Sequence, residues 1–116
     1  MLNTTELRDF AAMVGWEHGE SHRLEWWQEH ESDMDTDDLT PDYAYLENGK
    51  ITITAHGMLA AMAWAVKNKL YPSIDTRFMA VWIKDAEGTR FHVDFETIED
   101  IPATVVRAIY AGMKHA

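Results

Sequence analysis

The chain has 116 residues, of which 47% are hydrophobic, so it is predicted to form one domain over 1–116 with a single core. It contains no Cys, which excludes disulfides, thiolate chemistry and Cys-ligated zinc. Its 20 acidic and 10 basic residues give a formal net charge of -10. This charge disfavours direct binding to DNA or RNA phosphates, because such binding needs clustered cations.

The expected location is the cytoplasm. The opening sequence MLNTTELRDF carries charged residues where a signal peptide would have an apolar run. The longest apolar run, MLAAMAWAV at 58–66, has nine residues, well short of the ~20 that a membrane-spanning helix needs. We therefore predict a cytoplasmic protein that does not contact a membrane.

The first predicted element is a helix over 5–13. Thr4 or Thr5 is expected to cap its N-terminus, and Gly15 to end it. The next segment, WEHGESHRLEWWQEHES at 16–32, allows two interpretations. Its apolar residues would suit a short helix, whereas its Gly and Ser favour a turn.

An acidic run follows this ambiguous segment. Eight carboxylates and no Lys or Arg lie between 29 and 47, and the Thr40-Pro41 step favours a loop over 29–42. The sequence PDYAYLE is expected to open one helical turn at Pro41. The acidic residues are Glu29, Glu31, Asp33, Asp35, Asp37, Asp38, Asp42 and Glu47.

The middle of the chain contains a predicted strand and a predicted helix. KITIT at 50–54 has β-branched residues after an Asn48-Gly49 turn, so it is expected to form a short strand or to lead directly into the next helix. That helix is predicted over 56–70, rich in Ala, and Tyr71-Pro72 should end it.

The clearest local pattern is a β-hairpin over 77–84 and 89–96, with Gly88 in its loop. Its first strand is apolar on both faces, so the sheet is expected to be covered on both. A last helix is predicted over 102–114. The predicted fold class is α+β, with a small antiparallel sheet that could include 50–54 as a third strand and has helices over both faces.

This order of elements resembles small phage proteins with an α-β-α arrangement, the phage ABA-sandwich domain family. The resemblance rests on LRDFAAMVGWE, the Trp26-Trp27 pair, TPDY before an expected helix, and IPATVVRAIYAG in the last helix. The acidic loop over 29–38 and the segment NGKITIT depart from the family's pattern. The resemblance implies phage or prophage origin, so the expected cytoplasm is that of the host cell, and it implies no assigned chemistry and no functional residues.

Metal sites are not predicted. Asp33, Asp35 and Asp37 imitate the start of a calcium loop, but that loop would need Gly at 38 and Glu at 44, where the chain has Asp and Ala. His18 and His22 have the i, i+4 spacing of one helical face, yet the third ligand of a zinc hydrolase is lacking. Exposed histidines are the simpler interpretation for these residues and for His92 beside Asp94.

Enzyme activity is the minority hypothesis. The sequence has no Gly-rich phosphate loop, no G-x-S-x-G elbow and no Cys nucleophile. Its many carboxylates could include an acid/base pair, but they single out no residue. We therefore predict a protein that is not an enzyme and needs no cofactor.

The predicted partner-binding residues combine aromatic and acidic side chains. Adjacent Trp26 and Trp27 would point to opposite faces of an extended segment, so at most one is core, and aromatic side chains beside acids suit an interface with Arg or Lys. Equally, both could simply cover a small core. The predicted set is Trp26, Trp27, Glu29, Glu31, Asp33, Asp35, Asp37, Asp38 and Asp42.

Two functions follow from these patterns. The first is a non-enzymatic phage accessory protein whose carboxylates imitate nucleic-acid phosphates and bind a basic surface of a host or defence protein, as an anti-CRISPR or anti-nuclease inhibitor would. The second is a self-associating structural or assembly module in which the acids only maintain solubility. A homodimer is expected because the 58–66 helix and the 78–83 strand offer more apolar surface than a small domain covers.

Overall fold

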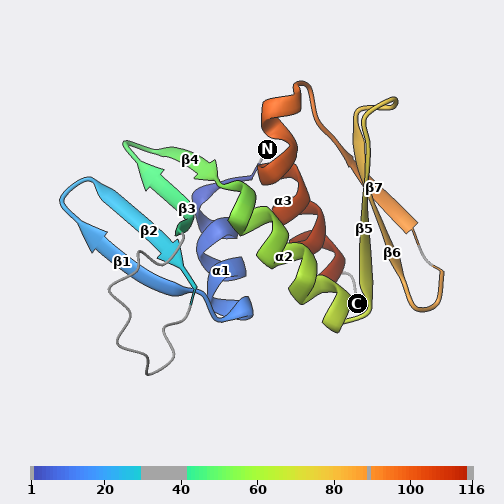
Figure 1. The fold of residues 1–116 in the computed structure, drawn as a ribbon, viewed down its shortest axis with the longest axis horizontal. Helices are drawn as coiled ribbons and strands as arrows, with labels where there is room; N and C mark the ends of the chain where they lie inside the picture. Colours follow the sequence, from blue (N-terminus) through green and yellow to red (C-terminus); the bar gives the residue numbers. More distant parts are fainter. Residues whose placement is uncertain (1, 30–41, 89, 115–116) are drawn as a thin grey trace.

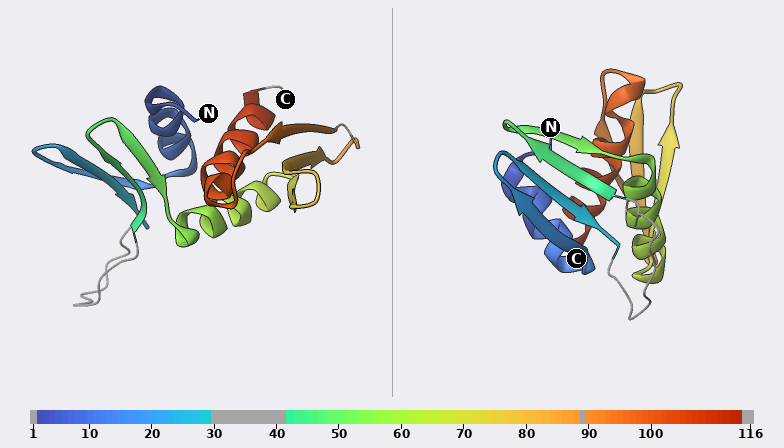
Figure 2. Two further views of the ribbon diagram at one scale, coloured as in Figure 1. Left: turned by 90° about the horizontal axis from the view of Figure 1, so that it is seen from above. Right: turned by 60° about the vertical axis from the view of Figure 1, so that its left-hand side comes forward.

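A computed structural model describes residues 2–29, 42–88 and 90–114 of the chain. It contains three α-helices and two antiparallel sheets, so the α+β class is confirmed. The helices lie between the two sheets (Figures 1 and 2). The expected arrangement, one sheet between layers of helix, is therefore not confirmed.

The N-terminal sheet has four strands in the order β1-β2-β3-β4. They are β1 (Glu17–Ser21), β2 (Leu24–Gln28), β3 (Asp42–Glu47) and β4 (Lys50–Ile53). The ambiguous 16–32 segment thus contributes a hairpin, β1-β2. The prediction that PDYAYLE opens a helical turn was wrong, because Asp42–Glu47 forms β3. In β3 the side chains of Ala44 and Leu46 are buried and alternate with the partly exposed Tyr43 and Tyr45, which is the period of a strand.

The strand predicted over 50–54 is confirmed as β4, but it belongs to this sheet and pairs with β3. Asn48 and Gly49 both have positive φ, 52° and 80°, which is the geometry of a type I′ hairpin turn. Because this short turn joins β4 to β3, β4 pairs with β3 and does not pair with the predicted hairpin.

The second sheet has the order β5-β6-β7. It consists of β5 (Leu70–Asp75), β6 (Ala80–Asp85) and β7 (Arg90–Asp94), so the predicted hairpin is confirmed with shorter strands. Its third strand, β5, was not predicted: residue 70 was expected to be the last of a helix that Tyr71-Pro72 ends. Pro72 is tolerated there because β5 is an edge strand, where one backbone N–H is not needed for pairing.

The helices are α1 (Thr4–Val14), α2 (Ala55–Lys67) and α3 (Ile101–Lys114), with a 3-10 turn, η1, at Ile98–Asp100. Asn3, rather than Thr4 or Thr5, caps α1. Its side chain accepts a hydrogen bond from the Glu6 backbone N–H at 2.8 Å, and the Glu6 carboxylate accepts one from the Asn3 backbone N–H. Gly15 ends α1 in the left-handed conformation, as predicted.

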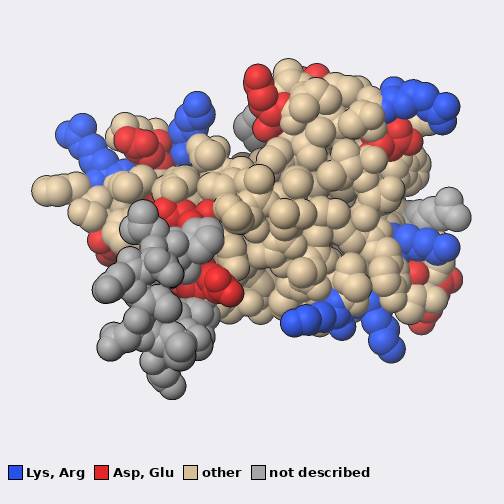
Figure 3. Space-filling model, in the orientation of Figure 1, with Lys and Arg blue, Asp and Glu red and all other residues tan. Residues whose placement is uncertain are grey.

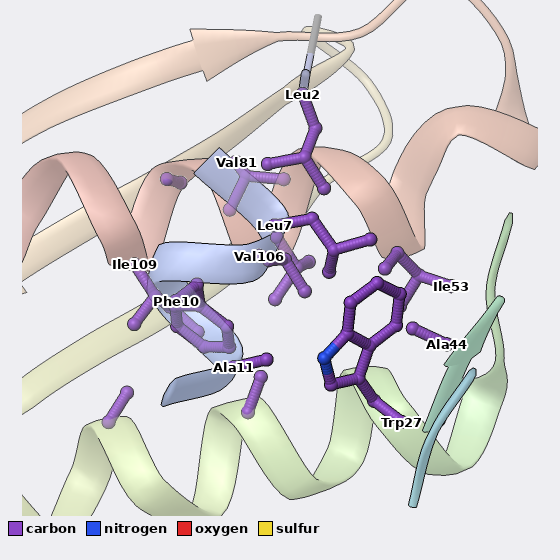
Figure 4. Close-up of a cluster of buried hydrophobic side chains, with 14 of the residues drawn as sticks. Leu2, Leu7, Phe10, Ala11, Trp27, Ala44, Ile53, Val81, Val106 and Ile109 are labelled. Carbon is purple, nitrogen blue, oxygen red and sulfur yellow. The ribbon is translucent and has the colours of Figure 1, made fainter. Parts of the chain in front are cut away.

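The core lies where the helices meet both sheets. Phe10 and Leu7 of α1, Ile109 of α3 and Val81 of β6 are fully buried, and Figure 4 shows them converging with Trp27. One continuous cluster therefore connects the two sheets through the helices. No helix within the described ranges is long and apolar enough to cross a membrane.

Candidate partner-binding surface

The structure describes four of the predicted partner-binding residues: Trp26, Trp27, Glu29 and Asp42. The other five lie outside the described residues, as does most of the loop predicted over 29–42; they are Glu31, Asp33, Asp35, Asp37 and Asp38. The described residues at the two ends of that segment are the last residue after β2 and the first residue of β3.

The two tryptophans point to opposite faces of β2, as expected for adjacent residues in a strand. Trp27 is only 3% exposed and lies in the core beside Leu7 and Ile53 (Figure 4). Its ring also contacts His18, with 5.1 Å between ring centroids. Trp27 is therefore a core residue and cannot serve as the surface anchor that was predicted.

Trp26 lies on the other face of the sheet, which we call the outer face. It pairs across the ladder with Gly19 of β1 and with Tyr45 of β3. A Cβ atom at position 19 would lie 2.4 Å from Cε2 of Trp26. The indole thus lies directly over the β1 backbone, and only glycine leaves room for it.

Tyr45 extends this aromatic surface and connects it to a carboxylate. Its hydroxyl donates a hydrogen bond to Oδ2 of Asp42 at 2.7 Å. The hydrogen bond, with a smaller effect of burial, raises the pKa of the Tyr45 hydroxyl, so the phenol stays a neutral donor to a charged acceptor. Trp26, Tyr45 and Asp42 form what we call the aromatic–acidic surface.

Glu29 lies close enough to the same part of the sheet to affect Tyr43. Burial raises the pKa of Tyr43, and the negative charge of Glu29 raises it further. The Tyr43 ring packs against Trp16, with 5.0 Å between centroids. Glu29 and Asp42 therefore place two carboxylates where the chain leaves and rejoins the four-stranded sheet.

A shallow hollow adjoins the aromatic–acidic surface on the outer face. Tyr45 forms one wall, and the floor and rim come from neighbouring strands and the β3-β4 turn; the lining is Leu24, Tyr45, Glu47, Asn48, Lys50 and Thr52. A long side chain that stacks on Tyr45 could extend its aliphatic part into this hollow.

The opposite face carries a polar cluster at the free end of the β1-β2 hairpin. The ligand atoms of His18, Glu20 and Glu25 lie within 4.8 Å of one another, which would suit a metal ion. However, Arg8 of α1 donates to both Glu25 oxygens, at 2.5 and 3.4 Å. A guanidinium thus already supplies the positive charge, and a metal ion would have to displace it.

The i, i+4 spacing of His18 and His22 does not place them on one helical face, and both are exposed, as in the simpler interpretation. His18 lies in β1, and His22 lies in the β1-β2 turn with φ of 48°. The i, i+4 spacing therefore does not bring the two imidazoles together, because it does so only in a helix. His92 lies on an exposed strand face, 3.4 Å from the Asp94 carboxylate and stacked against Trp82.

Charge is divided unequally along the chain. Residues 1–54, which include α1 and the four-stranded sheet, contain 13 Asp and Glu against 3 Lys and Arg, whereas residues 55–116 contain 7 of each. The whole formal charge of -10 therefore belongs to the N-terminal half. Figure 3 shows Asp and Glu side chains on the left of the molecule, where Figure 1 places the four-stranded sheet.

Tyr45 and Gly19 are the surface residues that the sequence did not reveal. The alternation of Tyr43 and Tyr45 in DYAYLE was the available signal for a strand, but the preceding proline favoured a helical start. Their position beside Trp26 depends on the sheet register, which for example pairs Trp26 with Tyr45, 19 residues away along the chain.

Comparisons with protein-family models, with curated proteins and with solved structures give no match to this chain. The resemblance to the phage ABA-sandwich family therefore stays an expectation, and the candidate surface is defined by its own geometry.

Proposed function

We propose that the chain is a non-enzymatic phage or prophage accessory protein that binds a basic surface of a host or defence protein. The observation that supports this most directly is the aromatic–acidic surface: Trp26 and Tyr45 pair across adjacent strands, and Asp42 lies 2.7 Å from the Tyr45 hydroxyl. Aromatic faces bind guanidinium groups by stacking, while adjacent carboxylates accept their hydrogen bonds.

The charge of the N-terminal half supports the same proposal. Thirteen acids against 3 bases over residues 1–54 give a field that attracts a basic protein and repels nucleic acid. A nucleic-acid-binding protein presents clustered Lys and Arg to phosphates. The proposed partner is therefore such a protein in the host cytoplasm, for example a nuclease or a CRISPR complex, whose nucleic-acid channel the carboxylates would occupy.

The first test uses a fluorescent Arg-rich peptide as a probe of the surface. Affinity should fall steeply as NaCl rises, because several ion pairs are screened together. Trp26→Thr should weaken binding by about tenfold, the loss typical of a central aromatic contact. Replacing Asp33, Asp35, Asp37 and Asp38 together by Asn should weaken it by roughly 1–4 kcal/mol.

The matched control is Trp82→Thr, which removes a Trp from the second sheet, where it is 36% exposed. This variant should bind the peptide like the parent. Equal weakening by both Trp substitutions, or affinity that does not change with salt, would contradict the proposal. For the natural partner, proteins captured from host lysate should be released by added duplex DNA, because both compete for one basic surface.

A second candidate function is self-association as a structural module. It is favoured by large apolar side chains that stay exposed in α2 and around the second sheet, namely Leu59, Val66, Tyr71, Phe78 and Trp82. These are the two regions from which a homodimer was expected.

A further inference from the structure

The β5-β6-β7 sheet has one face turned away from the helices. α3 packs against all three strands and α2 against β5, and Val81 and Ile83 of β6 point toward them and are fully buried. Of the alternate residues of β6, Trp82 and Lys84 are exposed, and the small Ala80 is buried. In Figure 1 no helix or strand of the described residues lies over this second face, which we call the open face.

Aromatic side chains occupy the middle of the open face. Trp82 of β6 pairs with His92 of β7 across the ladder, and their ring centroids are 4.6 Å apart. Tyr71 of β5, on the same face, is 44% exposed. A solvated sheet face normally carries polar residues, so a central Trp–His stack with an adjacent Tyr indicates a surface that is covered by a partner.

The charges of the open face are ordered along the strands. Lys84 lies in the same row as Tyr71, two residues from Trp82 along β6. Asp94 lies in the row of Ala80 and Asp75, two residues from Trp82 in the opposite direction. The face is therefore basic at one end, aromatic in the middle and acidic at the other end.

We propose that a second copy of this chain covers the open face, with a two-fold axis in the interface plane and perpendicular to the strands. Such an axis reverses the strand direction, so each basic end meets an acidic end. Lys84 then lies beside the partner's Asp94, and the same contact occurs twice by symmetry. The Trp82–His92 stack packs on its own copy, in the manner of two aligned sheets.

Charge complementarity selects this occupant. The twofold arrangement pairs both ends of the face at once, whereas a uniformly basic or uniformly acidic partner would be repelled at one end. The face spans three strands of about six residues, roughly 20 Å by 14 Å. This is smaller than half of a standard interface, so the dimer should be weak and its formation should depend on concentration.

Sedimentation equilibrium of the full chain, from about 5 to 500 µM, tests the proposal. The parent should change from monomer to dimer within this range, and Trp82→Thr should stay monomeric. Lys84→Asp and Asp94→Lys should each weaken the dimer at least tenfold, because each places like charges together twice. The double variant K84D/D94K should restore dimerisation in part, since it re-forms the two contacts between positions 84 and 94 with their signs exchanged while Asp75 and Arg90 keep theirs.

A control variant, Leu59→Ser with Val66→Ser, changes the exposed apolar side chains of α2 and should leave the dimer intact. Circular dichroism and the melting temperature verify that each variant is folded. A parent that remains monomeric, a double variant that fails to restore the dimer, or a dimer lost only on the α2 change would overturn the proposal. Binding of the Arg-rich peptide by Trp82→Thr is measured separately. A failed dimer test is therefore distinct from a failure of the proposed function.

Discussion

Gly57 shows how one absent methyl group controls the approach of α2 to β3. A Cβ atom there would lie 2.0 Å from the carbonyl oxygen of Tyr43. That carbonyl also accepts hydrogen bonds from the Thr54 backbone N–H at 3.0 Å and from its hydroxyl at 3.1 Å. Because Thr54 caps α2 as well, the carbonyl cannot move without loss of the cap.

We therefore expect Gly57→Ala to lower the free energy of unfolding by about 1–3 kcal/mol, as overpacking does. The usual gain from Gly to Ala in a helix, about 1 kcal/mol, would be outweighed. Gly112→Ala in α3 is the matched control, because its Cβ would meet side chains at 3.3 Å or more. Urea denaturation of both variants measures the difference, and a stabilised Gly57→Ala would refute the clash.

Between elements, the contact of α1 with β2 predicts a dependence of stability on pH. Arg8 and, to a lesser extent, His18 lower the pKa of the Glu25 carboxyl. A carboxyl with a lowered pKa in the folded state stabilises the protein above its unfolded pKa of about 4.3, and this contribution is lost as pH falls through the acid range. Glu25→Gln should remove it.

The parent should therefore be more stable than Glu25→Gln near neutral pH, and their melting temperatures should converge below about pH 3. Because Arg8 and Glu25 are not deeply buried, the difference should be small and should shrink in high salt. Glu47→Gln, at the far end of β3 from Asp42, serves as the control. A gap that persists at low pH would assign the effect to packing rather than to charge.

Which elements could be predicted depended on how local their signals are. α1, α3 and the β6-β7 hairpin have regular periodicity and marked ends, and their existence was predicted with bounds shifted by at most three residues. β1 and β5 were missed because Gly19 and Pro72 weaken their strand patterns, and long-range pairing stabilises them instead.

The candidate site, too, was predictable only where its signals are local in the sequence. Alternation in an extended chain separates Trp26 from Trp27, and this needs no tertiary information. The sequence does not show which of the two tryptophans is buried or that Tyr45 lies beside Trp26. Both depend on sheet register and on which face α1 covers. Those facts follow from the packing of segments far apart in the sequence.

At the scale of the whole molecule, the unequal charge has a cost in stability. The 13 acids of residues 1–54, offset by only 3 bases, repel one another within a molecule that is 42 Å in its longest dimension. At 10 mM salt the screening length is about 30 Å, comparable to the molecule, and at 150 mM it is about 8 Å. Added salt should therefore relieve most of this repulsion.

We expect the melting temperature to rise by a few degrees, roughly 2–6 °C, between 10 and 150 mM NaCl. The variant with Asn at positions 33, 35, 37 and 38 should melt higher than the parent at 10 mM and show a smaller rise, because four of the repelling charges are gone. Differential scanning calorimetry measures both. A melting temperature that falls with salt would mean that ion pairs such as Arg8–Glu25 outweigh the repulsion. If the rise is observed, a basic partner that neutralises these acids should stabilise the folded protein in the same direction, because it relieves the same repulsion in addition to its binding energy.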